Sequence, residues 1–382
     1  MGLRGLISAV MKVAFRVDSS AEIGSGHVMR CLTLADALRR RGRECVFICR
    51  TLVGNLIELI RSKGFMVYPL RNTARHTSLH APSELSLLSK ETNTAHASWL
   101  GCSWEQDLDD TLSILEHVEV DTVVVDSYAL DKSWEVLIRQ RCNFVVVIDD
   151  LADRSHDCDL LLDQNYSREK ADYDLLVNDT CSRLIGPKFA LLREEFPLMR
   201  PISLRRRADA RIKTILISMG GGDKDNVTSR VLQGLRSCDP NLDFEIKVVL
   251  GALALNIESV KRVASSLPWS VSILVNVTNM AELMMESDLA IGAAGGTSWE
   301  RCCLGLPAIT LVLAENQRLI SEGLSGKGAA FTCDLNNLEL NLGSLINRFF
   351  TDPDLLKTMS RKAAGITKGD GVNRVADEIM CL

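Results

Sequence analysis

The sequence predicts an α/β protein built from two doubly wound, Rossmann-like domains that face a cleft. Its 382 residues exceed the length of one typical domain. Short β-branched runs alternate with longer segments of helical period, which is the rhythm of βαβ units. The runs 121–126 and 144–148 are apolar without alternation, as in parallel strands that helices cover on both faces. Because ligands bind beyond the carboxyl ends of such strands, two domains of this kind predict a binding site in the cleft.

In the first half, hydrophobic periodicity predicts strands over 12–17, 44–49, 66–70, 121–126 and 144–148, with helices over 27–41 and 55–63. The helix over 27–41 has an apolar face that includes Leu32, Ala35 and Leu38. Between residues 72 and 110 the chain turns polar and carries His76, His80 and His96. We expect this segment to be a loop followed by the start of a long helix.

The second half repeats the rhythm, with predicted strands over 214–219, 244–250, 271–275, 289–292 and 308–313 and a helix over 226–235. The composition changes between the halves at 200–211, where Pro201 is followed by a run of arginines. We therefore predict an N-terminal domain over 11–200 and a C-terminal domain over 210–382.

Composition argues against several classes of protein. Apolar residues make up 46% and charged residues 24% of a chain with a formal net charge of −5, which is ordinary for a globular enzyme. The dense cationic stretch at 205–211 contains Asp209 and is narrower than a nucleic-acid-binding surface, so we expect no nucleic-acid partner. Twelve cysteines include no Cys-x-x-Cys pair, which predicts buried thiols in a reducing compartment and no zinc site.

Targeting signals are not evident in the sequence. Residues 1–10 are too short and too weakly apolar for a signal segment, and we expect them to be an extension ahead of the first strand. No uninterrupted run of about 18 apolar residues occurs, which is the length that a membrane span needs. We therefore expect a soluble, cytoplasmic protein without a membrane span.

The strongest local signal follows the first predicted strand, where Gly24, Ser25 and Gly26 lead into His27 and, one turn later, Arg30. Glycines allow a tight turn, and the free amides of a helix start favour an anion such as a pyrophosphate. A third glycine, which the dinucleotide-binding fingerprint requires, is replaced by His27. An exposed, neutral imidazole at this place could accept a proton. The alternative interpretation is a histidine that caps or packs the helix.

A second glycine turn opens the other predicted domain. Gly220, Gly221 and Gly222 follow a strand and precede Asn226 at a helix start, which suits close approach of a phosphate. Glycine turns after strands are also common for steric reasons alone.

A third turn runs from Gly292 to Glu300. Small residues, with Gly296 among them, leave room for a diphosphate over the helix start, and Thr297 and Ser298 could donate hydrogen bonds to it. Glu300 could accept two hydrogen bonds from a ribose diol, and it is also a favourable first-turn acid worth ~0.3–1 kcal/mol.

Together these signals resemble one enzyme family, the UDP-2,4-diacetamido-2,4,6-trideoxy-β-L-altropyranose hydrolases of pseudaminic acid biosynthesis. The resemblance covers about residues 11 to 330 in order. The matching positions are Phe15-Arg16, Asp18-Ser19-Ser20, Ile23 to His27, Arg30, Asp126, Tyr128, Ile148 to Asp150, Cys158 to Leu162, Asn165, Tyr173, Gly186, Ala190 to Phe196, Met219 to Gly221, Asp223, Asn226 and Glu300.

The resemblance implies a glycosyltransferase-B-like fold, similar to the lipid II N-acetylglucosaminyltransferase, in which water replaces the acceptor alcohol. It implies cleavage of the anomeric C–O bond of a UDP-sugar with inversion, giving UDP and the free diacetamido sugar, without a metal or other cofactor. By this pattern His27 is the general base of a catalytic, sugar-binding N-terminal domain. Amides and side chains of a UDP-binding C-terminal domain hold the nucleotide.

Further residues are candidates for substrate binding. Arg16 and Asp18 lie at a strand end and could orient His27 or contact the sugar. Tyr128, just past another strand end, is a sugar contact or a core residue, and Arg193 reaches the nucleotide or pairs with a neighbouring glutamate.

Trp299 and the pair of Asp149 and Asp150 are further notable residues. Trp299 is included in the nucleotide-binding turn, although it is bulkier than we expect at that place in relatives. Asp149 and Asp150 could suggest a metal pair, but adjacent strand residues point to opposite faces, so we expect no ion site there.

Other functions remain open at this stage. The same histidine could deprotonate an acceptor alcohol in a true glycosyltransferase, or the chain could be a non-catalytic sensor of sugar nucleotides. The exact sugar, the oligomeric state and the role of the 72–110 segment are not determined by the sequence.

Overall fold

The computed structural model describes residues 11–72, 94–209, 211–220, 222–251 and 254–382. The N-terminal extension, His76, His80 and Gly221 therefore lie outside the described residues. The chain forms two compact units. The first contains the described part of Met1–Asp163 with Glu169–Leu184 and Asn373–Leu382, and the second contains Gln164–Arg168 and Ile185–Val372. Each unit is described by itself.

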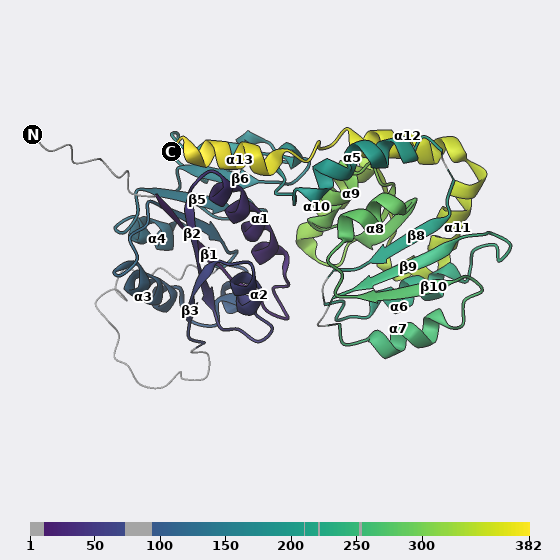
Figure 1. Cartoon of the computed structure of the whole chain (residues 1–382), viewed down its shortest axis with the longest axis horizontal. Coiled ribbons are helices and arrows are strands. Elements are labelled where there is room, and N and C mark those ends of the chain that lie inside the picture. Colours follow the sequence, from purple (N-terminus) through teal and green to yellow (C-terminus); the bar gives the residue numbers. More distant parts are fainter. Residues whose placement is uncertain (1–10, 73–93, 210, 221, 252–253) are drawn as a thin grey trace, which may run out of the picture. The chain divides into compact units, whose positions relative to one another are not determined.

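The first unit is built on a 7-stranded sheet with the order β3-β2-β1-β4-β5-β6-β7. Its strands are β1 (Lys12–Val17), β2 (Glu44–Arg50), β3 (Met66–Leu70), β4 (Thr122–Asp126), β5 (Phe144–Ile148), β6 (Leu160–Asp163) and β7 (Ser182–Ile185). Its helices are α1 (Gly26–Arg40), α2 (Ile57–Ser62), η2 (Ala97–Leu100), α3 (Trp104–Leu115), α4 (Lys132–Ile138), η3 (Lys170–Tyr173) and α13 (Gly371–Met380). In Figure 1, α3 and α4 lie on one side of the strands and α1 and α2 on the other.

The strand order of the first sheet places its topological switch point between β1 and β4. The two strands pair in parallel, with Val17 beside Asp126 at their carboxyl ends. From β1 the chain continues outward to β2 and β3, and from β4 it continues the other way to β5 and β6. The loops that follow β1 and β4 therefore diverge and leave a crevice at this edge, which is where ligands of doubly wound sheets bind.

The second unit repeats the design with a 6-stranded sheet of order β10-β9-β8-β11-β12-β13. Its strands are β8 (Thr214–Ser218), β9 (Glu245–Leu250), β10 (Val271–Val275), β11 (Leu289–Ala293), β12 (Ala308–Leu311) and β13 (Ala330–Thr332). Its helices are η4 (Pro187–Phe189), α5 (Glu195–Arg206), α6 (Val227–Leu235), α7 (Ile257–Ala264), α8 (Met280–Glu286), α9 (Thr297–Cys303), η5 (Glu315–Gln317), α10 (Arg318–Lys327), η6 (Leu335–Asn337), α11 (Leu338–Thr351) and α12 (Pro353–Ala364). The switch point lies between β8 and β11, which pair in parallel.

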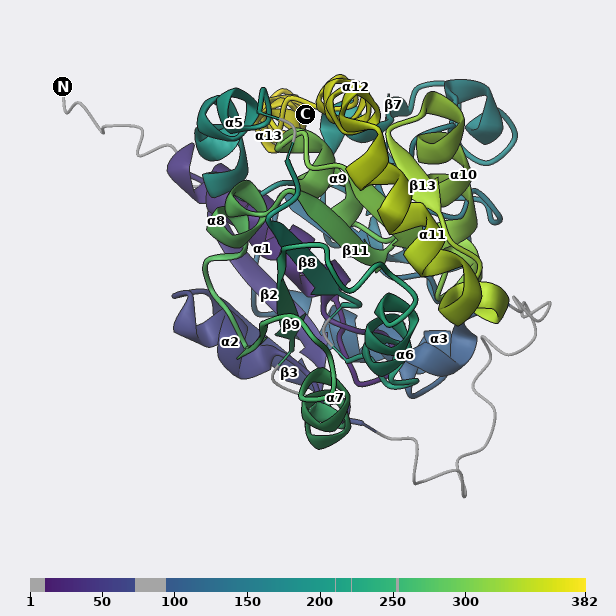
Figure 2. The same ribbon diagram turned by 90° about the vertical axis from the view of Figure 1, so that its right-hand side faces the viewer.

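Helices cover both faces of the second sheet, as the apolar strands predict. Ile215 and Ile217 of β8 belong to one buried cluster, while Leu216 between them belongs to another. The first cluster contains the apolar faces of α6 and α11, and the second contains those of α8, α9 and α10. In Figure 2, α6 and α11 accordingly lie on one side of β8 and α8 on the other. The α/β doubly wound architecture predicted from the sequence is therefore present in both units.

The predicted domain limits differ from the observed units. The arginine-rich stretch at 200–211 lies largely in α5, inside the second unit. Buried Arg207 donates hydrogen bonds to the carbonyl oxygens of Met284 and Ser287, both at 2.8 Å, and burial lowers its pKa to about 9. The composition break is thus a structural helix that caps carbonyls near the end of α8, and it is not a linker.

The chain's last helix also departs from the prediction. Most of α13 belongs to the first unit, where Arg41 after α1 donates to Asp377 at 2.8 Å. The predicted C-terminal domain over 210–382 includes this helix, whereas Asn373–Leu382 belongs to the first unit.

A buried ion network anchors the middle of the first sheet. Arg16 of β1 and Arg50 of β2 both pair with Asp107 of α3, and all three side chains are fully buried. Burial by itself raises the pKa of Asp107, but the two guanidinium groups outweigh it and hold that pKa below its usual value. The polar segment around α3 therefore supplies a structural counterion to two strands.

In the described part of the chain, no helix is both long enough and apolar enough to cross a bilayer.

We expect Asp107→Asn to destabilise the first unit by about 3 kcal/mol, because it removes the buried carboxylate that two buried guanidinium groups share and leaves each with a single carboxylate partner, Asp18 for Arg16 and Asp110 for Arg50. Urea unfolding followed by tryptophan fluorescence and circular dichroism measures the change. The matched control is Asp36→Asn, which removes an exposed pair with Arg39 and should cost at most about 1 kcal/mol.

The cost of Asp107→Asn should also depend on pH. The folded-state pKa of Asp107 is lowered, so the carboxylate's contribution is complete above the unfolded value of 3.8 and fades as pH falls through the folded value. The difference between wild type and Asp107→Asn should therefore shrink below about pH 4. A difference that stays constant between pH 7 and pH 3 would show that the charge of Asp107 is not what stabilises the unit.

Candidate functional site

The candidate site of the first unit lies at the switch point between β1 and β4. After β1, the chain makes a turn over 18–25 and enters α1, whose second residue is His27. Asp126 is the last residue of β4. The Nδ1 atom of His27 lies 2.6 Å from Oδ1 of Asp126, although the two residues are 99 positions apart in sequence. The fold thus joins an imidazole and a carboxylate that belong to different strand-to-helix connections.

The turn before α1 is set by its own residues. The Oγ atom of Ser20 accepts hydrogen bonds from the amides of Glu22 and Ile23, at 3.1 and 3.0 Å. Gly24 has a φ of +81°, in the left-handed region that favours glycine, and donates its amide to the carbonyl of Ser20. No atom lies within 4 Å of where a Cβ of Gly24 or Gly26 would stand. The backbone is therefore open to an approaching ligand at the start of α1.

His27 is more enclosed than the exposed imidazole that we predicted. The residue is only 8% exposed, because Asp126 and the edge of the Tyr128 ring close around it. Its surroundings are polar, and the ring does not sit in the apolar core. A carboxylate only accepts hydrogen bonds, so Nδ1 must carry the proton of the 2.6 Å contact. The Nε2 atom makes no hydrogen bond to any residue that the structure describes, and it is left as the acceptor when the ring is neutral.

Arg30 fixes the charge of Asp126. Its Nε and Nη2 atoms each donate to one carboxylate oxygen of Asp126 at 2.7 Å, and its Nη1 donates to Asp150 at 2.5 Å. Burial raises the pKa of Asp126, but Arg30 and His27 outweigh it and hold that pKa well below its usual value. Asp126 is therefore a permanent anion, as is required of a group that orients a histidine.

Tyr128 completes the cluster. Its hydroxyl donates to Asp150 at 2.7 Å, and its ring meets the ring of His27 edge to face at a centroid distance of 4.7 Å. Burial, and then the charge of Asp150, raise the pKa of Tyr128, so the phenol stays protonated. The residue is 5% exposed. Tyr128 therefore combines the two roles that the sequence left open, since it is largely buried and lies against the candidate base.

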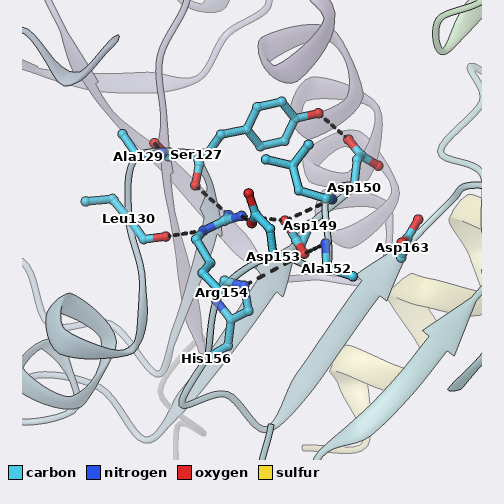
Figure 3. Close-up of polar contacts among 12 residues, drawn as sticks. Ser127, Ala129, Leu130, Asp149, Asp150, Ala152, Asp153, Arg154, His156 and Asp163 are labelled. Atoms are coloured by element: carbon cyan, nitrogen blue, oxygen red, sulfur yellow. Dashed lines mark hydrogen bonds and ion pairs between the residues drawn. The ribbon is translucent and has the colours of Figure 1, made fainter. Parts of the chain in front are cut away.

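Asp149 and Asp150 follow β5 and turn to different partners, as Figure 3 shows. Asp149 accepts from Arg154 at 2.9 Å and from the hydroxyl of Tyr173 at 3.0 Å, whereas Asp150 faces Tyr128 and Arg30. Burial raises the pKa of Asp149, but Arg154 and His156 outweigh it and lower that pKa to about 2. The first carboxylate thus stabilises the loop after β5, and the second belongs to the His27 cluster.

Arg16 and Asp18 do not orient His27, which is one of the two roles predicted for them. Arg16 is fully buried and pairs with Asp107 and, at 2.8 Å, with Asp18. Asp18 in turn accepts from the backbone amide of Arg50 at 2.6 Å. Neither side chain contacts His27 through a hydrogen bond or an ion pair. The arginine at the end of a strand is here part of the sheet's interior, because α3 supplies its counterion.

The second unit presents two turns at its own switch point, after β8 and after β11. Gly220 follows β8 with a φ of +91° and has open space where a Cβ would stand. Gly296, after β11, is likewise open. Asn226 adopts a left-handed conformation at the start of α6 and donates its side-chain amide to Ser259 at 3.1 Å. Two backbone turns at neighbouring strand ends are thus accessible. The side-chain oxygen of Asn226 is buried without a hydrogen-bond partner among the described residues, and its contact with a ligand stays a prediction.

A buried arginine supports the turn after β11. Arg301 donates to the carbonyl of Ala293 at 2.8 Å and to Oγ of Ser298 at 2.9 Å, and its Nη1 lies 3.5 Å from Oγ1 of Thr297. A Cβ on Gly292 would lie 2.7 Å from the Nη1 atom of Arg301, so only glycine at this position leaves room for the guanidinium group. Burial lowers the pKa of Arg301 to about 10, so the group is charged at neutral pH. Within the described chain, Arg301 has no ion pair with a carboxylate.

Glu300 and Arg193 lie close together in the second unit. Arg193 pairs with Glu195 at 2.9 Å and reaches Glu300 at 3.6 Å. Burial raises the pKa of Glu300, although Arg193 and Arg301 oppose that change. Glu300 therefore remains a candidate acceptor for a ligand, and Arg193 has the neighbouring glutamates as partners.

Trp299 is not a substrate contact through its side chain. It is 2% exposed and packs in the apolar cluster formed by α8, α9 and α10. The sequence predicts that Trp299, one residue before Glu300, belongs to the part of the turn that contacts the ligand. In the short helix α9, however, consecutive residues point in different directions, and Trp299 faces the core.

Sequence reasoning gave no role to three residues of these sites. The motifs contain Asp126 and Asp150 but assign neither a role, apart from the metal site rejected at Asp149 and Asp150, and they do not contain Arg301. The signal for Asp126 was available, because an acid that ends one buried strand meets the loop of a neighbouring parallel strand. Nothing in the sequence indicates that Arg301 is buried.

Comparisons with known proteins give the family context of these sites. Residues 214–378 match the family model of the glycosyltransferase family 28 C-terminal domain. The chain is 24% identical over 318 residues to a UDP-2,4-diacetamido-2,4,6-trideoxy-beta-L-altropyranose hydrolase from Campylobacter jejuni, covering 83% of this chain and 97% of that protein. The chain is thus similar to a hydrolase of this kind over most of its length. The resemblance indicated by the motifs is therefore confirmed.

Other relatives and solved structures extend the comparison. An uncharacterized protein from Methanocaldococcus jannaschii is 29% identical over 313 residues, and the match covers 81% of this chain but 57% of that longer protein. The crystal structure of Acinetobacter baumannii MurG matches with a TM-score of 0.68 and 16% identity, covering 97% of this chain and 100% of that one. The spinosyn rhamnosyltransferase SpnG matches with a TM-score of 0.63 and 15% identity, covering 96% of this chain and 100% of that one. The fold is glycosyltransferase-B.

The contact between Asp126 and His27 predicts the tautomer of the imidazole. With Asp126 as acceptor, the neutral ring of His27 should carry its proton on Nδ1. In Asp126→Asn, Arg30 should retain the amide oxygen and turn the NH₂ group toward His27, which favours the Nε2–H form. Two-bond ¹H–¹⁵N correlation spectra distinguish the two tautomers. Asp150→Asn is the control and should leave the His27 tautomer unchanged. An Nε2–H ring in the wild type would contradict the contact.

Proposed function

We propose that this protein hydrolyses a UDP-linked 2,4-diacetamido-2,4,6-trideoxyhexose to UDP and the free sugar. The reaction is cleavage of the anomeric C–O bond with inversion, as a step of nonulosonic (pseudaminic) acid biosynthesis, without a metal or other cofactor, in the cytoplasm. The observation that carries the proposal is His27, whose Nδ1 is held by Asp126 at 2.6 Å and whose Nε2 has no partner among the described residues. The similarity to the Campylobacter jejuni hydrolase supports the choice of substrate.

The proposed reaction is one displacement at the anomeric carbon. A water oxygen attacks that carbon while its proton passes to Nε2 of His27, which acts as general base. The bond between the anomeric carbon and the diphosphate oxygen breaks, and its electron pair leaves with UDP. Attack from the face opposite the leaving group inverts the configuration. The imidazolium that forms is stabilised by the adjacent carboxylate of Asp126, which Arg30 keeps ionised.

We propose that the second unit binds the nucleotide half of the substrate. The turns after β8 and β11 are open at Gly220 and Gly296, so their backbone can approach a diphosphate closely. The buried charge of Arg301 lies under the second turn and favours an anion above it. Thr297, Ser298 and Glu300 belong to the same segment, and Glu300 is the proposed acceptor for the ribose diol.

A glycosyltransferase is the second candidate function. The match of residues 214–378 to the glycosyltransferase family 28 C-terminal domain favours it, as does the similarity to transferases of known structure. In that reaction His27 would take the proton of an acceptor alcohol in place of water. The two functions share the donor site and differ in the nucleophile.

Incubation with the UDP-linked diacetamido sugar in ¹⁸O-labelled water separates these functions. The hydrolase should release free sugar and UDP without any acceptor, with the label on the anomeric oxygen of the sugar. ¹H NMR at early times should show the inverted anomer. Label in UDP would mean attack at phosphorus, and absence of release without an added alcohol would favour the transferase.

The His27→Gln variant tests the base. We expect kcat to fall about 10²–10⁴-fold because the variant has no group to accept the proton of water. The affinity for UDP, measured by titration calorimetry, should stay within about twofold, since the proposed nucleotide contacts belong to the other unit. Retention of full kcat by His27→Gln would exclude His27 as the base.

A further inference from the structure

The aromatic ring of Tyr128, which contacts His27, is itself in contact with two further rings that have no part in the proposed chemistry. The rings of His96 and Trp99 have centroids 4.4 Å apart, and the centroids of both lie within 6 Å of that of Tyr128, at 5.5 and 5.8 Å. Tyr128 in turn touches the ring of His27. The four rings form a continuous group that ends at the candidate base.

The η2 helix explains why His96 and Trp99 stand together. Trp99 donates its amide to the carbonyl of His96 at 2.9 Å, and side chains three positions apart eclipse one another in a 3₁₀ turn. Leu100, the next residue, is buried and anchors the turn in the unit. The two rings are therefore held in place by local backbone geometry.

Both rings are only partly covered. His96 and Trp99 are each intermediate in exposure, in contrast to Tyr128, which is buried. Neither side chain forms a hydrogen bond to another residue that the structure describes. An indole with free surface and a free N–H, fixed beside a proton-accepting site, has the properties of a ligand-contacting residue, because aromatic residues offer an apolar face together with one polar atom.

The charge state of His96 fits such a surface. Burial lowers the pKa of His96, and Arg154 and His27 act in the same direction against the pull of Asp153. At neutral pH the ring is thus an uncharged aromatic group. A neutral ring packs against apolar parts of a ligand without the desolvation cost of a cation.

We propose that Trp99 and His96 form an aromatic subsite that contacts the methyl-bearing groups of the sugar bound beside His27. The proposal rests on the proposed function for the identity of the sugar. A 2,4-diacetamido-2,4,6-trideoxyhexose carries a methyl group at C5 and one on each acetamido group, and these groups suit aromatic faces. The indole N–H can donate to an acetamido oxygen. Trp99 and His96 are thus specificity-determining residues, and they take no part in proton transfer.

Trp99→Ala tests the subsite through the affinity that the sugar adds to the nucleotide. Titration calorimetry measures the dissociation constants of UDP and of the UDP-linked diacetamido sugar in a His27→Gln background, where turnover is suppressed. The ratio of interest is the dissociation constant of UDP divided by that of the UDP-sugar. We expect this ratio to fall about tenfold in Trp99→Ala, because the UDP-sugar binds more weakly, and this corresponds to ~1.4 kcal/mol. The constant for UDP alone should not change. Trp99→Phe should retain most of the ratio, because it keeps an aromatic face.

Two controls separate recognition from folding. Trp104→Phe alters a tryptophan at the start of α3, five positions away, and should leave both constants unchanged. Saturation-transfer NMR of the bound UDP-sugar should show strong transfer to its methyl protons in the His27→Gln protein and a clear loss when Trp99→Ala is added. A general loss of structure would appear in Trp99→Ala itself as a changed circular dichroism spectrum and a lower unfolding temperature.

The outcomes distinguish this proposal from the proposed function. If the wild type releases free sugar and Trp99→Ala leaves the ratio of constants unchanged, the subsite is wrong and the hydrolase stands. If no sugar is released but the ratio falls in Trp99→Ala, the subsite stands and the hydrolase is wrong. Equal affinity for UDP and UDP-sugar in the His27→Gln protein would overturn the subsite, because the sugar would then contribute no binding.

Discussion

The candidate chemistry of this protein depends on one buried carboxylate, Asp126. It is taken out of water at the end of β4, and burial alone would favour its neutral form. Two hydrogen bonds from Arg30 reverse that preference, and the resulting anion fixes Nδ1 of His27. Without the anion, the imidazole would have no fixed tautomer or orientation. Arg30 also joins Asp126 to Asp150, so the site's charges form one network that connects α1, the end of β4 and the loop after β5.

The topology of the sheets explains where the two candidate sites lie. In each sheet the chain reverses its direction of travel at the middle, between β1 and β4 in the first and between β8 and β11 in the second. The loops that leave these strand pairs diverge, so side chains and free backbone groups can face a ligand there. The first sheet presents an imidazole with its carboxylate at this place. The second presents two open glycine turns above a buried arginine.

Arginines illustrate why a charge in a motif is not by itself evidence of a ligand. Arg16 and Arg30 both belong to the first motif, yet Arg16 is closed inside the sheet by Asp107, 91 positions away. Arg207 lies in the stretch that separates the two predicted domains, yet it is buried against helix-end carbonyls. Arg301 was not noted at all, although within the described residues it is a buried cation without a carboxylate partner. The partner of each arginine comes from a distant segment, and its identity decides whether the charge is structural or available.

The sequence by itself determined the architecture, because apolar strands without alternation and helices of regular period admit few folds other than doubly wound sheets. It also located the glycine turns, and His27 beside one of them, because tight turns after strands require glycine and few positions in the chain carry it there. The tertiary structure decided the partners. Asp126 faces His27, Trp299 faces the core, Arg16 belongs to an internal network, and most of α13 belongs to the first unit. Each of these depends on contacts between segments far apart in the chain. Periodicity reports which face of an element is buried, whereas the group that meets that face is set only when the elements pack.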